Sequence, residues 1–575
     1  MKAKHPPVHL TTIRRKYKDK VYETHLLRRS TREGDKVRNE TVANLSRLPA
    51  DVIELIRLAL AGHKLVPASD AVQVKRTLPT GHVRAVLGMM KKLGIADLLS
   101  SRSSRERDLV MAMIAERVLD PTSKLGTVRL WETSTLGVDL GVEGSDVDEL
   151  YGALDWLLER QARIETKLAG RHLGEGGLAL YDASNSHYEG RTCPLAQLGH
   201  DKDGRRGVKV ISYGVMTDRE GRPVAMDVYP GNTGDPTTVP DQIFKLRGRF
   251  GLENVVLVGD RGMLTSSKIE YMRQHPGLGW ISALRSDAIR KLVEGEALQL
   301  SLFDEVNLAE IRSPDFPGER LVACFNPLLA DERKRKRIDL LDATEKLLTK
   351  VAVEVAGRTS KPMSAGEIGQ KIGRVLYRHK MAKHFRVVIA DGSLKWTRDH
   401  EGIRREADLD GIYVIRTSEP AERLSAEDTV RSYKMLAQVE QGFRCMKGID
   451  LRVRPIFHRD EDRVRAHFFL CMLAYYVEWH MRRVLAPLLF QDQAVVADRL
   501  TRDPVAKPEP SPSVKAKKRT RQTPDGLPVQ SFHSLLVALS TQARVTCSLG
   551  HTAATFDQLS AATPLQQRAF DLLGV

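Results

Sequence analysis

The chain has 575 residues, which suggests three or four domains of about 150 residues each, and its 42% hydrophobic and 28% charged content excludes collagen-like and wholly disordered classes. Its longest apolar run, the ten residues from Phe468 to Val477, is too short to cross a bilayer, which needs about 20. The five cysteines form no Cys-x-x-Cys pair, as expected in a reducing compartment. We therefore expect a cytoplasmic protein with no membrane partner.

The charge is basic and unevenly distributed. The chain carries 90 Lys and Arg against 73 Asp and Glu, a net charge of +17. Residues 1–47 hold 13 Lys and Arg against 5 Asp and Glu, and residues 501–525 hold 7 against 3. Such an excess indicates a polyanion partner, above all nucleic acid, although a solubilising surface with a basic linker would carry similar charge.

Residues 1–70 are expected to form a basic β unit followed by a helix. Apolar and polar residues alternate at 21–27 and 36–45, on either side of the turn signal Gly34-Asp35. A broad apolar face at 51–63 then predicts a helix.

A helical region is predicted over residues 71–172. Apolar residues recur there at helical spacing, and Asp120-Pro121 marks a break between two helices. Such a block could bind DNA, mediate dimerisation or pack as a scaffold on the core. The helices are predicted at 82–93, 105–118, 145–159 and 161–170.

Residues 173–284 alternate between strand and helix signals and form the first part of the predicted core. An apolar strand, a hairpin and two further strands separated by helices describe a mixed α/β sheet. The strands are predicted at 178–182, 207–217, 223–229, 255–260 and 280–284, and the helices at 239–250 and 265–274.

Residues 285–410 interrupt this order with a charged helix at 331–350 and short strands around the hairpin turn Asp391-Gly392. Residues 411–490 resume the core with a strand, a long helix over 426–447 and an apolar helix. The remaining residues are predicted to form a basic flexible linker over 491–530 and a helical tail over 531–575.

Three acidic residues are candidates for metal-dependent chemistry. Asp182 and Asp260 each end an apolar strand, and Glu440 lies on the long helix. A carboxylate at the end of a buried strand projects into the crevice where α/β proteins usually bind ligands, and Mg²⁺ prefers carboxylate oxygens. Each signal alone also fits a blander role, because such an Asp is often a cap or turn residue and such a Glu is often solvated.

The long helix carries a stripe of polar residues. Tyr433, Glu440, Arg444 and Lys447 are separated by 7, 4 and 3 residues, which places them on one face of an unbroken helix. Flanking apolar residues indicate that this face is partly buried. An ordinary Glu440–Arg444 ion pair is the simpler reading of the same spacing.

Three ordered motifs resemble the DDE transposases of bacterial insertion sequences, in the groups numbered four and 1634. The last block of that family has Tyr, Arg, Glu and Lys at fixed spacing; this chain keeps Tyr433, Glu440 and Lys447 but has Leu436 at the Arg position. The other two blocks are Tyr181-Asp182-Ala-Ser-Asn-Ser-His-Tyr188-Glu189-Gly190 and Val258-Gly-Asp260-Arg-Gly-Met263.

The resemblance implies an α/β fold with a ribonuclease H-like catalytic core, interrupted by a β-rich insertion over 285–410 and preceded by an N-terminal β plus helical DNA-binding region. It implies that Asp182, Asp260 and Glu440 are catalytic and ligate two Mg²⁺ ions, with Mn²⁺ as a substitute.

It also implies phosphate contacts near the scissile bond. Tyr433 and Lys447 would make them, and Arg444 would stand in for the Arg that Leu436 replaces. Whether a DNA hairpin forms as an intermediate stays open because of Leu436.

The implied function is DNA transposition. A metal-activated water would cleave a phosphodiester at each terminal inverted repeat, and the freed 3′-hydroxyl would attack target DNA. A homodimer on double-stranded DNA is expected because two ends must be joined, and the site of action would be the bacterial nucleoid. We expect the basic side chains Arg14, Arg15, Lys16 and Lys18 to bind the transposon ends.

Several alternatives compete with this interpretation. A ribonuclease H-like nuclease would cut without strand transfer, and a repressor derived from a transposase would bind DNA without cutting. Tyr188 could act as the nucleophile of a covalent recombinase. His187, His458 and His467 could bind a metal, although hydrogen-bonded structural roles fit their wide spacing better.

Overall fold

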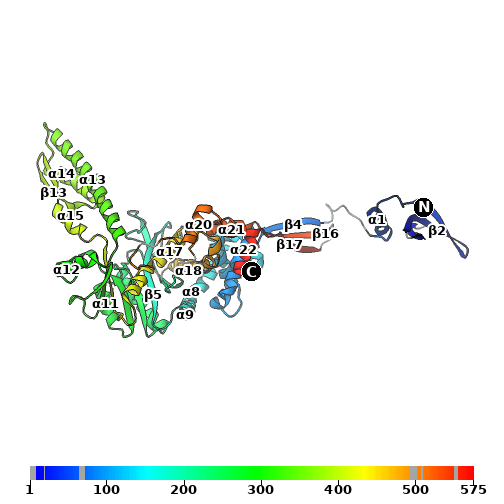
Figure 1. Ribbon diagram of the computed structural model, residues 1–575, viewed down its shortest axis with the longest axis horizontal. Helices are drawn as coiled ribbons and strands as arrows, with labels where there is room; N and C mark the ends of the chain where they lie inside the picture. The colour runs from blue at the N-terminus through cyan, green and yellow to red at the C-terminus, as the bar shows by residue number, and fades with distance from the viewer. Residues whose placement is uncertain (1–7, 19, 64–71, 493–501, 507–508, 550–553) are drawn as a thin grey trace. The chain divides into compact units, whose positions relative to one another are not determined.

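The computed structural model describes residues 8–18, 20–63, 72–492, 502–506, 509–549 and 554–575 (Figure 1). The chain divides into two compact units, and each draws on two separate stretches of sequence. The first comprises Met1–Leu78 with Arg544–Ser560, and the second comprises Pro79–Ala543 with Ala561–Val575.

The first unit contains two three-stranded sheets and a helix. In one sheet β1 (Val8–Tyr17), β2 (Lys20–Glu33) and β3 (Lys36–Asn44) pair antiparallel, and α1 (Ala50–Leu60) follows. Gly34, at φ +65°, takes the left-handed turn conformation between β2 and β3 that the sequence predicts. The second sheet has the order β17-β16-β4, from β4 (Val72–Pro79), β16 (Ala543–Leu549) and β17 (Thr555–Leu559).

The second unit begins with helices close to the predicted positions. Their starts are fixed by capping side chains: Ser104 accepts a hydrogen bond from the Arg107 amide, and Asp146 forms a capping box with Glu149. The helices are α3 (Gly81–Lys92), α4 (Ile95–Leu99), α5 (Arg105–Leu119), α6 (Lys124–Leu130), α7 (Leu136–Leu140), α8 (Val147–Glu159) and α9 (Gln161–His172).

A nine-stranded mixed sheet forms the centre of this unit. Its order is β11-β12-β15-β10-β9-β5-β7-β6, with β8 also paired to β7. The central strand β5 runs parallel to β9 and antiparallel to β7, and β9 runs parallel to β10. The strands are β5 (Gly177–His187), β6 (Gln197–Leu198), β7 (Lys209–Thr217), β8 (Pro223–Pro230), β9 (Val255–Val258), β10 (Leu278–Ala283), β11 (Leu308–Ile311), β12 (Arg320–Phe325) and β15 (Ile412–Thr417).

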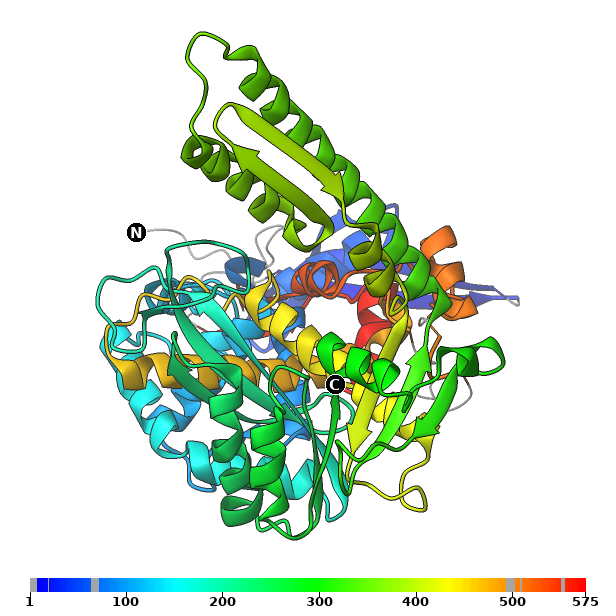
Figure 2. The ribbon, with the colours of Figure 1, turned by 90° about the vertical axis from the view of Figure 1, so that its left-hand side faces the viewer.

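Helices cover this sheet (Figure 2). α17 (Leu436–Lys447) packs on β5 and β7, and α18 (Glu461–Val484) packs on β8 and on α5, α8 and α17. None of the described helices is long and apolar enough to cross a bilayer, and the apolar residues of α18 are buried inside the protein. Further helices contact the sheet: α9 lies against β8, α11 (Ser266–Arg273) against β10, and α16 (Ala426–Lys434) against β10 and β15. Helix α10 (Val239–Phe244), continued by a π turn over Lys245–Arg249, is hydrogen-bonded to β8 through Gln242 and Asp227.

The expectation that residues 285–410 are β-rich is wrong. Helices dominate this region, and the long charged segment forms one continuous helix, α13. The strands β11 and β12 join the central sheet, while β13 and β14 form an isolated hairpin that packs with α13 and α14 around a separate apolar cluster. The elements are α12 (Ser286–Glu294), α13 (Pro327–Gly357), α14 (Ala365–His379), β13 (Phe385–Ala390), β14 (Ser393–Arg398) and α15 (His400–Ala407).

Two boundaries in the core also differ from prediction. The strand predicted over 178–182 continues to His187, so Asp182 lies inside β5 rather than at its end. The helix predicted over 426–447 is divided at Met435 into α16 and α17. Tyr433 and Glu440 therefore belong to two successive helices instead of one face of a single helix.

The C-terminal predictions need correction as well. Of the predicted linker 491–530, residues 493–501 and 507–508 lie outside the described part, but Pro512–Thr520 forms helix α20. Its Lys517 is buried and donates hydrogen bonds to the carbonyl oxygens of Ala486 and Leu489, so this part packs on the body of the unit. The tail contains the strands β16 and β17 between helices α21 (Phe532–Ser540) and α22 (Pro564–Leu573).

Candidate active site

Asp182 and Asp260 lie on neighbouring parallel strands. β5 and β9 pair in register up to Leu180 and Val258, so two further residues along each strand bring Asp182 level with Asp260. Because side chains alternate along a strand, residues at equal steps from a registered pair point to the same face of the sheet. The two carboxyl groups therefore share one face, where β9 ends.

The loop after β9 orients Asp260. Its Oδ1 accepts hydrogen bonds from the backbone amides of Gly262 at 2.9 Å and Met263 at 2.8 Å. Its carbonyl oxygen accepts a hydrogen bond from the Ser282 hydroxyl at 3.1 Å. The carboxylate is thus positioned by its own loop and by β10, without help from another charged side chain in these contacts.

Helix α17 brings Glu440 to the same face of the sheet. The ring of Phe443 packs edge-on against Tyr213 of β7, with 5.6 Å between the ring centroids. Tyr213 is the register partner of Ser184, two residues from Asp182, and therefore shares its face. Glu440 precedes Phe443 by about one helical turn and is exposed to solvent, which leaves its carboxylate free to reach the two aspartates.

Tyr433 lies within electrostatic range of all three carboxylates. Burial, together with the negative charges of Asp260, Asp182 and Glu440, raises the pKa of its phenol to about 12 against the opposing effect of Arg261. The phenol stays protonated at neutral pH and can donate a hydrogen bond. The three predicted carboxylates are thus gathered around one tyrosine even though the helix that carries it is broken.

Lys202 is a neighbour of Asp182 that the sequence does not reveal. Burial raises the pKa of Asp182 to about 7; the charge of Lys202 lowers it, and those of Asp260 and Asp235 raise it. The Lys202 ammonium donates hydrogen bonds to the Ala183 carbonyl at 2.6 Å and to Asp235 at 2.9 Å. The lysine lies in a loop between two strands, and no motif there marks it as part of a site.

Lys447 lies at the other end of α17, beside a second basic residue. Its ammonium is 3.4 Å from one carboxylate oxygen of Asp203, and Arg454 is 3.0 Å from the other. Arg454 also lies 2.5 Å from a ring nitrogen of His187, the last residue of β5. Lys447 is therefore linked through Asp203 and Arg454 to the end of the strand that carries Asp182.

Comparison with known proteins decides the family. A model described as the transposase DDE domain matches residues 178–477, which cover more than half of the chain and contain all three carboxylates. This chain is a DDE transposase. A second model, the N-terminal domain of IS1634 family transposases, matches residues 10–69 and thus the first sheet and helix of the transposase. The two matches make it a DNA transposase of the insertion-sequence type, an enzyme that cleaves and transfers DNA strands.

One solved structure, described as the cryo-EM structure of a piggyBac transposase synaptic complex with hairpin DNA, is also similar. It has 9% sequence identity and a TM-score of 0.34, and the match covers 81% of this chain and 82% of that one. A similarity this low adds nothing to the argument on the site. No curated protein matches the transposase significantly.

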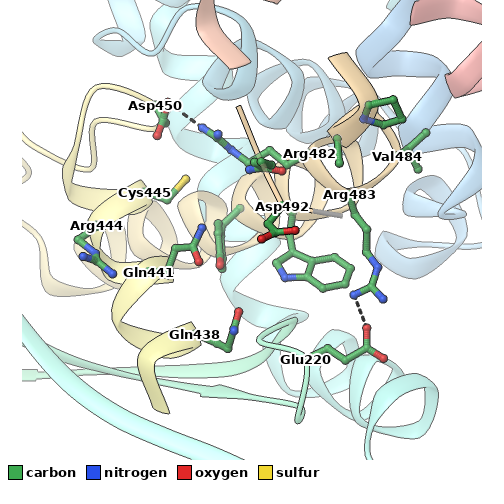
Figure 3. Close-up of a pocket in the computed structure, with 15 residues that line it drawn as sticks. Glu220, Gln438, Gln441, Arg444, Cys445, Asp450, Arg482, Arg483, Val484 and Asp492 are labelled. Atoms are coloured by element: carbon green, nitrogen blue, oxygen red, sulfur yellow. Dashed lines mark hydrogen bonds and ion pairs between the residues drawn. The ribbon is translucent and has the colours of Figure 1, made fainter. Parts of the chain in front are cut away.

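Arg444 lies about one helical turn after Glu440 on α17. It lines a different pocket with Gln438, Gln441 and Cys445, on the side of α17 drawn in Figure 3. The described residues show no ion pair between Glu440 and Arg444, so the simpler reading of their spacing is not realised.

That pocket contains the transposase's tightest group of potential metal ligands. Ligand atoms of Cys445, Asp450 and Glu478 all lie within 4.8 Å of one another, the one such group of three among the described residues. However, Arg482 is bound to both carboxylates, at 2.5 Å from Glu478. It lies 2.9 Å from Asp450, and Figure 3 shows this second pair. The guanidinium already supplies the positive charge, and we regard this group as an internal ion-pair network.

Asp182, Asp260 and Glu440 do not meet this single-ion criterion, since their ligand atoms are not all within 4.8 Å of one another. A pair of ions about 4 Å apart needs a wider arrangement than one ion does. This separation by itself assigns no ion to the three carboxylates.

The four basic residues predicted to bind DNA ends lie at the tip of the β1–β2 hairpin and are exposed. Arg14 is already paired with Glu23 of β2, at 2.7 Å. Arg15, Lys16 and Lys18 have no such carboxylate partner among the described residues.

The three histidines have structural partners. His187 is 3.0 Å from Glu189, and the buried His467 lies 2.9 Å from the Val453 carbonyl oxygen. The rings of His458 and His467 pack at 5.3 Å between centroids. None of the three belongs to a group of metal ligands among the described residues.

Proposed function

We propose that Asp182, Asp260 and Glu440 are the catalytic residues of this transposase and together hold two divalent ions, Mg²⁺ with Mn²⁺ as a substitute. The observation that carries the proposal is the register of β5 and β9, which brings the two aspartates level on one face beneath α17. The gathering of three carboxylates around Tyr433 supports it.

The strand order supports a ribonuclease H-like core. In the order β8-β7-β5-β9-β10, β7 runs antiparallel to both β8 and β5. The strands β5, β9 and β10 run parallel to one another. The chain leaves this core after β10 and returns at β15, so residues 285–410 are the insertion. The insertion contributes β11 and β12 to the sheet and the α13–α14 pair beside it.

The donor set fits divalent ions. Mg²⁺ prefers carboxylate oxygens, and a bound cation would hold Asp182 ionised against the burial that raises its pKa to about 7. Two such ions supply an activated oxygen nucleophile and stabilise the leaving oxygen of an in-line displacement at phosphorus.

Other side chains of the site position the DNA strand. Lys447 would exchange its 3.4 Å contact with Asp203 for a DNA phosphate, and the protonated phenol of Tyr433 would donate a hydrogen bond to a phosphate oxygen. Arg444, about one helical turn after Glu440 on α17, would add a further contact to a phosphate.

The substrates follow from the two-ended reaction. The first unit, with Arg15, Lys16 and Lys18 at a hairpin tip, would bind the double-stranded terminal inverted repeats, and the second unit would cut them and join them to target DNA. Because both ends must be processed together, we propose a homodimer on DNA, acting in the bacterial nucleoid.

The test compares the wild type with Asp182→Asn on labelled DNA carrying the inverted repeats that flank the gene. We expect the wild type to cleave and join the ends with Mg²⁺, and the variant to bind them without cleaving. Cleavage by Asp182→Asn at the wild-type rate would overturn the assignment.

The same assay separates the rival functions. Cleaved ends without joined products would indicate a nuclease, and binding without cleavage by the wild type would indicate a repressor. A protein–DNA adduct would indicate covalent recombination through Tyr188, whose hydroxyl instead lies 3.0 Å from the His458 carbonyl oxygen in the structure.

A further inference from the structure

A basic pocket lies between the helical region and the segment that links α17 to α18. Its volume is about 670 Å³, and its walls come from the end of α5, the start of α6, α8 and residues 452–463. The lining contains a single acidic residue, Asp460, and six cationic ones: Arg117, Lys124, Arg452, Arg454, Arg459 and Arg463.

Lys124 is the unusual member of this pocket. It is only 6% exposed, yet its ammonium has no hydrogen bond or ion pair among the residues that the structure describes. Burying an unpaired charge is costly, and burial, reinforced by the charge of Arg117, lowers the pKa of Lys124 to about 7. An anion in the pocket would remove this cost by giving the ammonium a partner.

The positive charge of the pocket is poorly compensated from within the protein. Asp460 uses its carboxylate to cap α18, accepting hydrogen bonds from the amides of Asp462 and Arg463. Arg117 donates to backbone carbonyls rather than to a carboxylate. Among the six cations, Arg454 is paired with Asp203, and Arg463 makes a looser 3.7 Å pair with Asp155.

Two neighbouring histidines respond to this charge. Burial, together with the charges of Lys124, Arg463 and Arg117, lowers the pKa of His458 to about 4. The pKa of buried His467 is lowered by the same kind of environment. Both side chains are neutral at physiological pH. The positive charge of the pocket therefore comes from Lys124 and the arginines.

The pocket is close to the proposed active site. Arg454 joins the two, because it lines the pocket and also contacts His187 at the end of β5. His187 is five residues beyond Asp182, about 16 Å along an extended strand. Duplex DNA carries one phosphate per strand for roughly each 3.4 Å of its axis, so this distance corresponds to about five nucleotides.

We propose that this basic pocket binds a backbone phosphate of the DNA substrate, with Lys124 as the buried ligand and Arg117 and Arg459 beside it. DNA held at the catalytic aspartates would present a backbone phosphate to the pocket away from the scissile bond. The pocket thereby fixes the register of the strand at a point remote from the chemistry.

The decisive variant is Lys124→Met, tested as the full-length protein on transposon-end DNA in metal-free buffer at several salt concentrations. The apolar replacement removes a buried unpaired charge, so the variant is expected to fold. Losing one phosphate contact should weaken binding and reduce the slope of log affinity against log salt by about one.

Lys517→Met is the matched control. Lys517 is equally buried, at 6% exposed, but its ammonium is satisfied by the carbonyl oxygens of Ala486 and Leu489 at 2.8 and 3.1 Å. Its salt slope should equal that of the wild type. An unchanged slope for Lys124→Met, or an equal reduction in both variants, would overturn the proposal.

A second arm identifies the source of the phosphate. If millimolar inorganic phosphate raises the melting temperature of the wild type but not of Lys124→Met, while the DNA salt slopes remain identical, the pocket takes a free anion and the DNA assignment is wrong. The proposal rests on the protein being a transposase, but it is read from binding alone. Its failure would therefore leave the assignment of Asp182, Asp260 and Glu440 untouched.

Discussion

Two groups of potential metal ligands share helix α17, and they differ in how negative charge is balanced. Cys445, Asp450 and Glu478 lie close together, but Arg482 binds both carboxylates. Asp182 and Asp260 have Lys202 as a neighbour, whose ammonium is hydrogen-bonded to Ala183 and Asp235 instead. The two groups thus differ in that Arg482 pairs directly with the first, whereas the proposed metal-binding carboxylates have no such ion pair among the described residues.

The largest effect expected from this comparison is on catalysis. Asp260→Asn should lower the rate of end cleavage on the order of a thousandfold, because losing a carboxylate ligand removes several kcal/mol of transition-state stabilisation. Asp450→Asn should leave cleavage near the wild-type rate. Timed cleavage of labelled ends with Mg²⁺ measures both, and the reverse ranking would exchange the roles of the two groups.

The next effect is on stability. Arg482→Met should destabilise the protein by about 3 kcal/mol, because it leaves the buried Glu478 and Asp450 without their cation. Urea unfolding followed by circular dichroism measures the change. Added Zn²⁺ should restore part of the stability of the variant but not increase that of the wild type; a wild type stabilised through Cys445 would contradict the ion-pair interpretation.

A smaller effect concerns the pH dependence of the metal-free protein. The pKa of Asp182 is raised to about 7 in the folded state, so between about pH 4 and pH 7 the folded protein binds more protons than the unfolded chain. Wild-type stability should therefore fall over this range as pH rises, relative to Asp182→Asn. Thermal unfolding at pH 5 and pH 8 in chelator tests this; a difference that stays constant with pH would rule out the buried carboxyl as its cause.

The smallest effect separates two neighbouring arginines of the first unit. Arg15→Gln should weaken the binding of transposon ends more than Arg14→Gln, because the Arg14 guanidinium already forms an ion pair with Glu23. Fluorescence anisotropy with transposon-end DNA at low salt can resolve the difference. Equal losses would show that the Arg14–Glu23 pair opens on DNA.

Much of the fold could be predicted from local sequence. The hairpin of β7 and β8 and the helices α5 and α8 follow from apolar periodicity, turn residues and capping side chains, which act over a few residues. The family motifs mark Asp182 and Asp260 in the sequence, although Asp182 lies inside β5 and not at its end as predicted.

What failed depends on contacts between distant residues. The backbone dihedral angles of Met435 are those of an ordinary helix. The local sequence therefore does not predict the break between α16 and α17. Helix α20 was taken for a flexible linker because its composition is basic, yet Lys517 is buried by residues about 30 positions earlier. The basic pocket joins Arg117 and Lys124 to residues more than 300 positions away, which no spacing rule could reveal.

The sheet formed by β4, β16 and β17 has a consequence for protein synthesis. β4 ends at Pro79 and its neighbour β16 begins at Ala543, so about 460 residues are added between them. At roughly 5–20 residues per second, this takes about half a minute to a minute and a half. A truncated translation product that ends before β16 therefore cannot form this sheet. In the full-length protein, the sheet can form only after most of the chain has been synthesised.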